Sequence, residues 1–335
     1  MTSIKDIAKM AGVSASTVSR AINNKQYVKP DIRDKIMALV KKTGYVPDGA
    51  ARSMVLGRTF TVGIVIPDTF NMFQRQLFST IEHCLEGHGY RTSFFFVKWE
   101  PESESRCLMR LKAQKLDGVI MMHEVGEPEF YDYLAASGMP VVLCTFERPE
   151  TGLPSIHVAE EEAAKAATRH LISLGHRNIG LISGQHFSFG TQRAAGYRSA
   201  LEGAGISAVS ALSVLVPSYS ADDGRAGMRS LLSRKTTPTA VFAATDELAI
   251  GAIRALHEAG LKVPDDVSVI GFDDIDISDY LVPALTTVSQ PIHDMGRTTA
   301  EMMSDLISGE DRKRGVAPFG HRLVIRESCA APRTG

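Results

Sequence analysis

A run of small polar side chains that ends in an arginine lies close to the N-terminus. Its members are Ala15, Ser16, Thr17, Ser19 and Arg20. Serine and threonine hydroxyls donate or accept hydrogen bonds at base edges and phosphates, and a guanidinium can bridge O6 and N7 of guanine. A helix with this face fits the major groove of double-stranded DNA. The alternative is an amphipathic hairpin whose polar face is only solvated.

Two short helices must hold this face in place. Ser3 and Asp6 have the spacing of a capping box, Gly12 supplies the permissive backbone that a sharp turn needs, and Ser14 can cap a second helix. Apolar residues recur at helical spacing on both sides of the turn, at Ile4, Ile7, Ala8, Ala11, Val13, Val18 and Ile22. The pattern predicts a helix-turn-helix over residues 4–23.

A third helix follows. Pro30 is a good first helical residue, Asp31 favours the positive end of the helix, and Gly44 stops it. Its apolar face consists of Ile32, Ile36, Leu39 and Val40. We expect this helix to close a small core under the first two, which completes an all-α head over residues 1–47.

Charge separates this head from the rest of the chain. Residues 1–58 hold 11 Lys and Arg against 4 Asp and Glu, a net charge of +7, whereas the remainder holds 26 basic and 34 acidic residues, a net charge of −8. A basic segment at one end of an acidic chain is typical of electrostatic attraction to nucleic acid. Lysines at 5, 9, 25 and 29 would lie near phosphates.

Three motifs resemble the lactose-repressor family of bacterial transcription regulators. They are Ile4-Lys5-Asp6-Ile7-Ala8 with Ala11-Gly12-Val13-Ser14 and Ser16-Thr17-Val18-Ser19-Arg20-Ala21-Ile22-Asn23, then Tyr45-Val46-Pro47-Asp48-Gly49-Ala50-Ala51-Arg52-Ser53-Met54, and Val267-Ser268-Val269-Ile270-Gly271-Phe272-Asp273-Asp274. The resemblance covers nearly the whole chain. It implies a homodimer that binds near-palindromic operator DNA.

The resemblance also implies a hinge helix within residues 48–58 that forms on the operator. Two copies would lie in the minor groove, where Met54 takes the place of a leucine that wedges a base step. Met54 as an ordinary linker residue is the alternative. The expected DNA-binding residues are Lys5, Ser14, Ala15, Ser16, Thr17, Ser19, Arg20, Asn23, Arg52 and Met54.

Residues 59–335 alternate apolar, β-rich runs with helical segments. The expected strands are 61–67, 91–97, 117–122, 140–145, 155–158, 178–183, 211–216, 240–244, 267–272 and 286–289. The expected helices are 73–88, 102–115, 160–174, 191–204, 224–233, 246–259 and 294–308. Continuous apolar strands between helices predict an α/β core of parallel sheets covered on both faces.

The family resemblance implies a periplasmic-binding-protein-like core of two lobes whose chain crosses between them three times. We place the crossings near residues 160, 290 and 321. One lobe then holds 60–160 with 291–320, and the other holds 161–290 with 321–335. Ligands of such sheets bind in the crevice at the carboxyl ends of the strands.

Side chains just beyond the strand ends are candidates for binding a small effector in that crevice. The candidates are Phe73, Phe146, Arg193, Tyr219, Asp246 and Asp273, within a wider set that includes Asp68 to Phe73. Aromatic faces, carboxylates and a guanidinium suit a sugar or a sugar acid. By the resemblance these positions match effector contacts, Tyr219 less closely. Phe73 and Phe146 are equally compatible with core packing, and Asp246 with capping of the following helix.

Two polar pairs stand apart from the family pattern. The family often carries Asp-Asn after the strand that ends at Val158, and this chain has Ala159-Glu160. The change puts the effector class in question. His123-Glu124, near another strand end, is compatible with either ligand or solvent contact.

Several classes of protein lack support in the sequence. The cysteines at 84, 107, 144 and 329 form no C-x-x-C pair, the histidines show no metal-ligand spacing, and no phosphate-binding glycine motif occurs. We therefore expect no metal, no cofactor and no enzymatic activity. No apolar run approaches the length of a membrane span, so we expect a cytoplasmic protein without membrane contact.

Taken together, the sequence predicts a DNA-binding regulator, a repressor of a carbohydrate-utilisation operon, switched by a sugar or sugar acid in the inter-lobe cleft. The alternative is a sugar-binding or Rossmann-like enzyme with a head-like extension. The chain ends without leucine heptads, so we expect a dimer rather than a tetramer.

Overall fold

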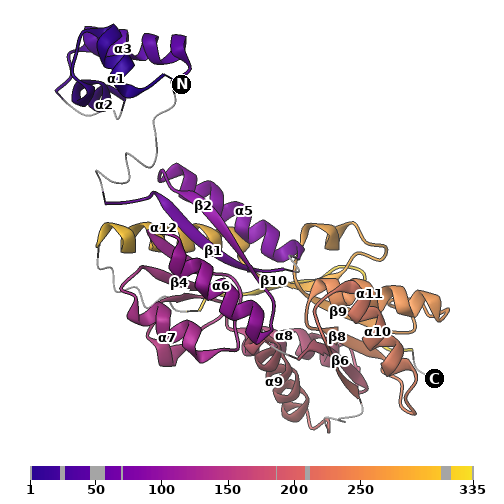
Figure 1. The fold of residues 1–335 in the computed structure, drawn as a ribbon. Coiled ribbons are helices and arrows are strands. Elements are labelled where there is room, and N and C mark those ends of the chain that lie inside the picture. The colour runs from indigo at the N-terminus through magenta and orange to yellow at the C-terminus, as the bar shows by residue number, and fades with distance from the viewer. Residues whose placement is uncertain are drawn as a thin grey trace. The chain divides into compact units, whose positions relative to one another are not determined.

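A computed structural model describes residues 2–22, 27–45, 57–68, 71–185, 187–207, 212–310 and 318–333. The chain divides into two units, Met1–Thr59 and Phe60–Gly335, which we call the head and the core and describe separately (Figure 1). Most of the predicted hinge segment 48–58 lies outside the described residues.

The head contains the three predicted helices, α1 (Ile4–Ala11), α2 (Ala15–Ile22) and α3 (Pro30–Thr43). The Ser3 capping box is present, because the Ser3 hydroxyl accepts from the Asp6 amide at 3.3 Å and the Asp6 carboxylate accepts from the Ser3 amide at 2.8 Å. Gly12 adopts a φ of 73°, the left-handed conformation that the turn requires. The predicted helix-turn-helix is confirmed.

A small apolar core joins these helices. Ile7, Val18 and Ile36, one from each helix, are completely buried against one another. The Lys35 ammonium donates to the Ala11 carbonyl at 3.0 Å, which ties α3 to the end of α1. Because α1 and α3 pack against one face of α2, the opposite face of α2 is left exposed to solvent.

The core holds two sheets. The first has the order β2-β1-β3-β4-β5 and the second the order β11-β10-β9-β8-β6-β7. The strands of the first are β1 (Thr61–Pro67), β2 (Arg91–Val97), β3 (Gly118–Met121), β4 (Val141–Cys144) and β5 (Ser155–Ile156). Those of the second are β6 (Ile179–Gly184), β7 (Ser213–Val216), β8 (Ala240–Ala243), β9 (Ser268–Asp273), β10 (Thr286–Ser289) and β11 (Arg322–Val324).

Helices cover both sheets and define two lobes (Figure 1). Lobe 1 is the first sheet with α5 (Met72–Gly87), α6 (Pro101–Ala113), α7 (Pro128–Ala136) and α12 (Ile292–Ser308). Lobe 2 is the second sheet with α8 (Glu160–Ser173), α9 (Ser188–Gly203), α10 (Ala221–Leu232) and α11 (Asp246–Glu258). Two short 3₁₀ turns are η1 (Pro149–Thr151) and η3 (Asp276–Asp279). No helix in the described ranges is long and apolar enough to cross a membrane.

The chain passes between the lobes three times. It leaves the first sheet after Val158 and enters α8, returns from β10 into α12, and passes back from Phe319 into β11. The bridge between Val158 and Phe319 places the first and third crossings side by side. Three adjacent connections restrict the lobes to hinge-like relative motion.

Two elements of the core depart from the sequence prediction. The strand β11 was not expected, and it pairs antiparallel with β10 at the edge of an otherwise parallel sheet. The helix α7 was also missed. Both are short, of three and nine residues, so neither develops a periodic pattern that stands out from its surroundings.

Helices α10 and α11 of lobe 2 pack backbone to backbone at two glycines. A Cβ placed on Gly251 would meet the carbonyl oxygen of Ala221 and the amide of Arg225, and a Cβ on Gly224 would meet the backbone of Leu248. No flexible side chain can move aside at these contacts. The spacing of the two helices therefore depends on glycine.

We expect Gly251→Ala to lower the free energy of unfolding of the core by about 3 kcal/mol, because overpacking of backbone forces the helices apart. Urea unfolding followed by Trp99 fluorescence measures it. The control is Gly203→Ala in α9, where the added Cβ has no atom within 4 Å and should be neutral or stabilising by up to about 1 kcal/mol. Equal stabilities of the two variants would contradict the packing account.

Candidate functional site

The outward face of α2 is the candidate DNA-contacting surface of the head. Ser16 and Arg20 are exposed, and Thr17 and Ser19 are half-buried. Arg20 forms no salt bridge with the described residues, so its guanidinium is available. Lys5 is exposed on α1.

Ser14 has a mainly structural position. Its hydroxyl accepts from the Thr17 amide at 3.2 Å, which caps α2 as predicted, and it lies within hydrogen-bond distance of the Ser16 and Thr17 hydroxyls. Ala15 is half-buried and packs against the head core. Asn23, Arg52 and Met54 lie outside the described residues.

In the core, a cavity of about 560 Å³ lies between the lobes, and we call it the cleft. Its walls come from segments that follow strands β1, β2, β3 and β4 in lobe 1 and β6, β7 and β8 in lobe 2. The cleft therefore lies at the carboxyl ends of the strands of both sheets, the edge at which open α/β sheets bind ligands.

Aromatic rings form much of the cleft wall. The lining rings are Trp99, Phe146, Phe187, Phe189 and Tyr219. Phe187 and Phe189 stack at 5.5 Å with an interplanar angle of 5°, and Phe189 lies 4.8 Å from the Tyr219 ring. Trp99 of lobe 1 meets Phe187 of lobe 2 edge to face at 5.1 Å. These rings offer flat apolar faces, on which the C–H face of a sugar ring can stack.

Two carboxylates of the cleft join the lobes. Glu124 in lobe 1 accepts from the Ser188 amide at the start of α9 at 2.8 Å, and Glu247 in lobe 2 accepts from the Met72 amide at the start of α5 at 3.0 Å. Both contacts place a negative charge at a helix N-terminus, where the helix dipole stabilises it. Arg148 lies 3.1 Å from Glu124 and balances its charge.

His123 is a buried polar side chain in the cleft wall. Its ring lies 5.1 Å from Phe187 and 6.4 Å from Trp99, and its Nε2 atom is buried without a hydrogen bond. Burial lowers the pKa of His123 to about 4, so the imidazole is neutral near pH 7. The structure thus brings the His123-Glu124 pair, ambiguous in the sequence, into the cleft.

Behind this wall lies a buried charged cluster centred on Arg193. Its Nε donates to Glu160 at 2.7 Å, its Nη1 donates to the Ala244 carbonyl at 2.5 Å, and Nη1 lies 3.6 Å from Asp273. The guanidinium stacks on Phe272 at 3.6 Å and on Phe189 at 4.8 Å. Burial alone would lower the pKa of Arg193, but the two carboxylates outweigh it and raise that pKa.

Asp246 and Asp273 are buried with their own hydrogen-bond donors. Asp246 accepts from the Ile275 amide and the hydroxyls of Ser278 and Thr287. Asp273 accepts from Gln290 at 2.7 Å. Burial raises the pKa of both carboxyls, that of Asp273 well above its ordinary value.

The predicted effector residues thus fall into two groups. Phe146 and Tyr219 line the cleft, as does Asp68, whereas Phe73, Arg193, Asp246 and Asp273 are not among its lining residues. Phe73 packs in the lobe 1 core, and Thr245, not Asp246, caps α11. Knowing where a strand ends places a residue at the correct edge of the sheet, but it does not tell which side chains turn into the core.

Several cleft residues were missed. Trp99, Phe187, Phe189 and Glu247 all follow predicted strands within a few residues, so the strand-end criterion, applied to every strand, would have included them. Across the described part of the chain, no group of three or more His, Cys, Asp or Glu side chains is arranged to hold a metal ion.

Comparison with known proteins gives matches for both units. Residues 3–48 match bacterial regulatory proteins, lacI family, and residues 168–329 match the periplasmic binding protein-like domain. Catabolite control protein A of Priestia megaterium is 32% identical over 327 residues, 97% of this chain and 98% of the relative. The ribose operon repressor of Haemophilus influenzae is 32% identical over 330 residues, 98% of each protein.

Solved structures give the same result. The lac repressor dimer bound to operator and the anti-inducer ONPF has a TM-score of 0.88 and 27% identity, covering 98% of this chain and 99% of that one. The transcriptional regulator CelR in complex with cellobiose has a TM-score of 0.74 and 30% identity, covering 98% and 100%. The likeness therefore extends over head and core.

The buried His123 makes the stability of the core depend on pH. Its folded pKa of about 4 lies below the ordinary value of 6.5, so the unfolded chain binds more protons between these limits. The contribution of the neutral His123 to the free energy of unfolding is fully present above about pH 6.5, and it is lost as the pH drops toward 4. We expect His123→Gln to reduce this fall by about 2 kcal/mol at pH 4.5, measured by urea unfolding at several pH values.

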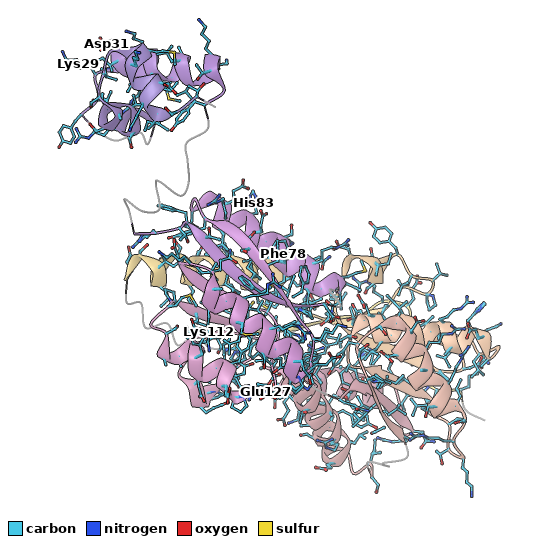
Figure 2. The ribbon with its side chains drawn as sticks, viewed as in Figure 1. Lys29, Asp31, Phe78, His83, Lys112 and Glu127 are labelled. Atoms are coloured by element: carbon cyan, nitrogen blue, oxygen red, sulfur yellow. The ribbon has the colours of Figure 1, made fainter. Side chains whose placement is uncertain are left out.

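The matched control is His83→Gln. His83 is exposed on α5 and points away from the lobe (Figure 2). This variant should keep the pH dependence of the unmodified protein, and an equal change in both variants would show that His123 is not the group responsible.

Proposed function

Because the chain belongs to the lacI family of bacterial regulatory proteins, DNA-binding regulators with a ligand-binding core, we propose that it represses a carbohydrate-utilisation operon under the control of a saccharide. The observation that carries this proposal is the aromatic wall of the cleft, which has the chemistry of a sugar site. The head reads the operator, and the cleft binds the effector.

DNA recognition rests on the outward face of α2. With Ser14 used as a cap, Ser16, Thr17 and Arg20 are the groups best placed to contact base edges, and Lys5 supplies a phosphate contact. Asn23, Arg52 and Met54 keep the DNA contacts proposed from the family pattern, with Met54 as the minor-groove wedge.

Two copies of the chain bind together to a near-palindromic operator. The edge strand β2 exposes Phe94 and Phe96. Phe78, which Figure 2 labels on α5, packs on Phe94 with 4.9 Å between ring centroids. Lobe 2 exposes Tyr280 and Val282, which are 78% and 94% accessible. Exposed apolar side chains, those of β2 on a sheet edge and those of lobe 2 after η3, favour burial against a second copy. The relative of known structure with the higher TM-score is itself a dimer on its operator.

The effector binds between the lobes and stacks on the cleft rings, with direct contacts from Phe146 and Tyr219. Phe73, Arg193, Asp246 and Asp273 support the walls from behind. Ligand binding changes the angle between the lobes, and in a dimer this changes the separation of the two hinge segments 48–58. Couplings of this kind typically amount to about 1–3 kcal/mol. The protein acts in the bacterial cytoplasm, on the nucleoid when it is bound to DNA.

Arg20→Ala tests the DNA contact. We expect a loss of about 1–3 kcal/mol in operator binding and relaxed discrimination at one base pair, because a bidentate guanine contact is removed. Fluorescence anisotropy on operators selected from a random library, and on their single-base variants, measures both effects.

Lys5→Ala is the comparison variant. Loss of a phosphate contact should weaken binding uniformly across sequences. It should also reduce the slope of log affinity against log salt concentration by about 1. If Arg20→Ala also weakens all sequences equally, Arg20 contacts only the phosphate backbone. If the unmodified protein selects no sequence, the proposed function is wrong.

A further inference from the structure

We propose that the cleft selects an uncharged saccharide and rejects acidic sugars. The reason is that Glu160 already pairs with the buried guanidinium of Arg193, and that carboxylates line the cavity. This inference rests on the proposed function and narrows the effector from sugars and sugar acids to neutral sugars. Three features of the core carry it: the Arg193 cluster, the charges of the cleft wall, and the neutral groups that remain for binding.

The first feature is that Arg193 already has its counter-ion. The Glu160 carboxylate accepts a hydrogen bond from Nε at 2.7 Å, and the Ala244 carbonyl and Asp273 face Nη1. Only 3% of Arg193 is accessible, and the ring of Phe189, which lines the cleft, covers its guanidinium. An acidic ligand could reach this guanidinium only by displacing both Phe189 and an internal carboxylate.

Glu160 also belongs to the pair Ala159-Glu160 at which the chain departs from the family pattern. The side chain of Glu160 is only 6% accessible, and it reaches from the first residue of α8 to Arg193 of α9. Breaking a buried ion pair leaves an uncompensated buried charge, which is strongly unfavourable. The pair is therefore a stable part of lobe 2 rather than a site that a ligand can open.

The second feature is the charge of the wall. Four carboxylates line the cleft, at Asp68, Glu100, Glu124 and Glu247, and Lys98 is the basic side chain among the described lining residues. Lys98 pairs with Asp68 at 3.7 Å, and Arg148 pairs with Glu124. Glu100 and Glu247 form no salt bridge with described residues, so the wall keeps an excess of negative charge that repels anions.

The third feature is the set of groups left to bind. Carboxylates accept hydrogen bonds from sugar hydroxyls, and the Trp99 and Phe187 rings take the apolar face of the sugar. The neutral His123 has an unused, buried Nε2 that can exchange a hydrogen bond with a hydroxyl. The cavity of about 560 Å³ is of a size that holds a small saccharide.

Thermal shift and calorimetric titration of the full-length protein test the proposal with matched probes. The neutral probes are glucose, galactose, mannose, cellobiose, lactose and maltose. For each hexose, and for the non-reducing residue of each disaccharide, the acidic probes are the uronate and the 6-phosphate, and the cationic probe is the 2-amino sugar. We expect at least one neutral sugar to bind and its acidic counterparts to bind at least tenfold more weakly.

The outcomes distinguish failure of the charge selection from failure of the proposed saccharide function. An acidic sugar that binds as tightly as its neutral parent overturns the inference but leaves a saccharide effector in place. A preference for the amino sugar likewise overturns selection of an uncharged ligand. If none of the probes binds, the proposed saccharide function fails, and the inference fails with it.

Glu160→Gln tests the role assigned to the buried pair. Removal of this carboxylate leaves the Arg193 charge only partly compensated, by Asp273, and we expect the discrimination against the uronate to fall several-fold. The control is Glu161→Gln, the exposed neighbour on α8, which should keep the original ratio. If Glu160→Gln does not fold, Glu100→Gln at the exposed part of the wall should reduce discrimination several-fold. An unchanged ratio in the folded variant would contradict the proposal.

Discussion

The arrangement of the core depends on two hydrogen bonds that cross the cleft. Glu124 and Glu247 each accept an amide at the first turn of a helix in the opposite lobe. A hydrogen bond to a charged group contributes about 1.5–3 kcal/mol. Two such bonds hold the two cleft walls in contact, so that the Trp99 and Phe187 rings meet. Their combined free energy is small enough for a ligand to shift the equilibrium between lobe arrangements.

The buried Arg193 cluster is a hydrogen-bonded part of lobe 2 that lies next to the crossings between the lobes. Glu160 follows the first crossing and Gln290 precedes α12 at the second, and both bind the cluster, through Arg193 and Asp273 respectively. We therefore expect motion between the lobes to arise in the connecting residues rather than within the Arg193 cluster. Phe189 stacks on Arg193 and also lines the cleft, so it connects the buried cluster to the cleft wall.

Much of this organisation is predictable from the sequence, and the failures have a physical pattern. The capping box of Ser3 and the turn at Gly12 depend only on neighbouring residues, so both are correct. The long strands are also correct, because their apolar runs are continuous. The inward or outward direction of Arg193 depends on Glu160, 33 residues away, and this pairing has no local signature. The same is true of Glu247, whose amide donor belongs to the other lobe.

The central claim is that the cleft and the operator-binding head are coupled, and linkage provides its most direct test. The operator dissociation constant is measured by anisotropy with and without a saturating neutral sugar, and the sugar dissociation constant with and without operator DNA. The account predicts that both change by the same factor, about 5–150-fold. An operator affinity that does not change when the cleft is fully occupied would contradict it.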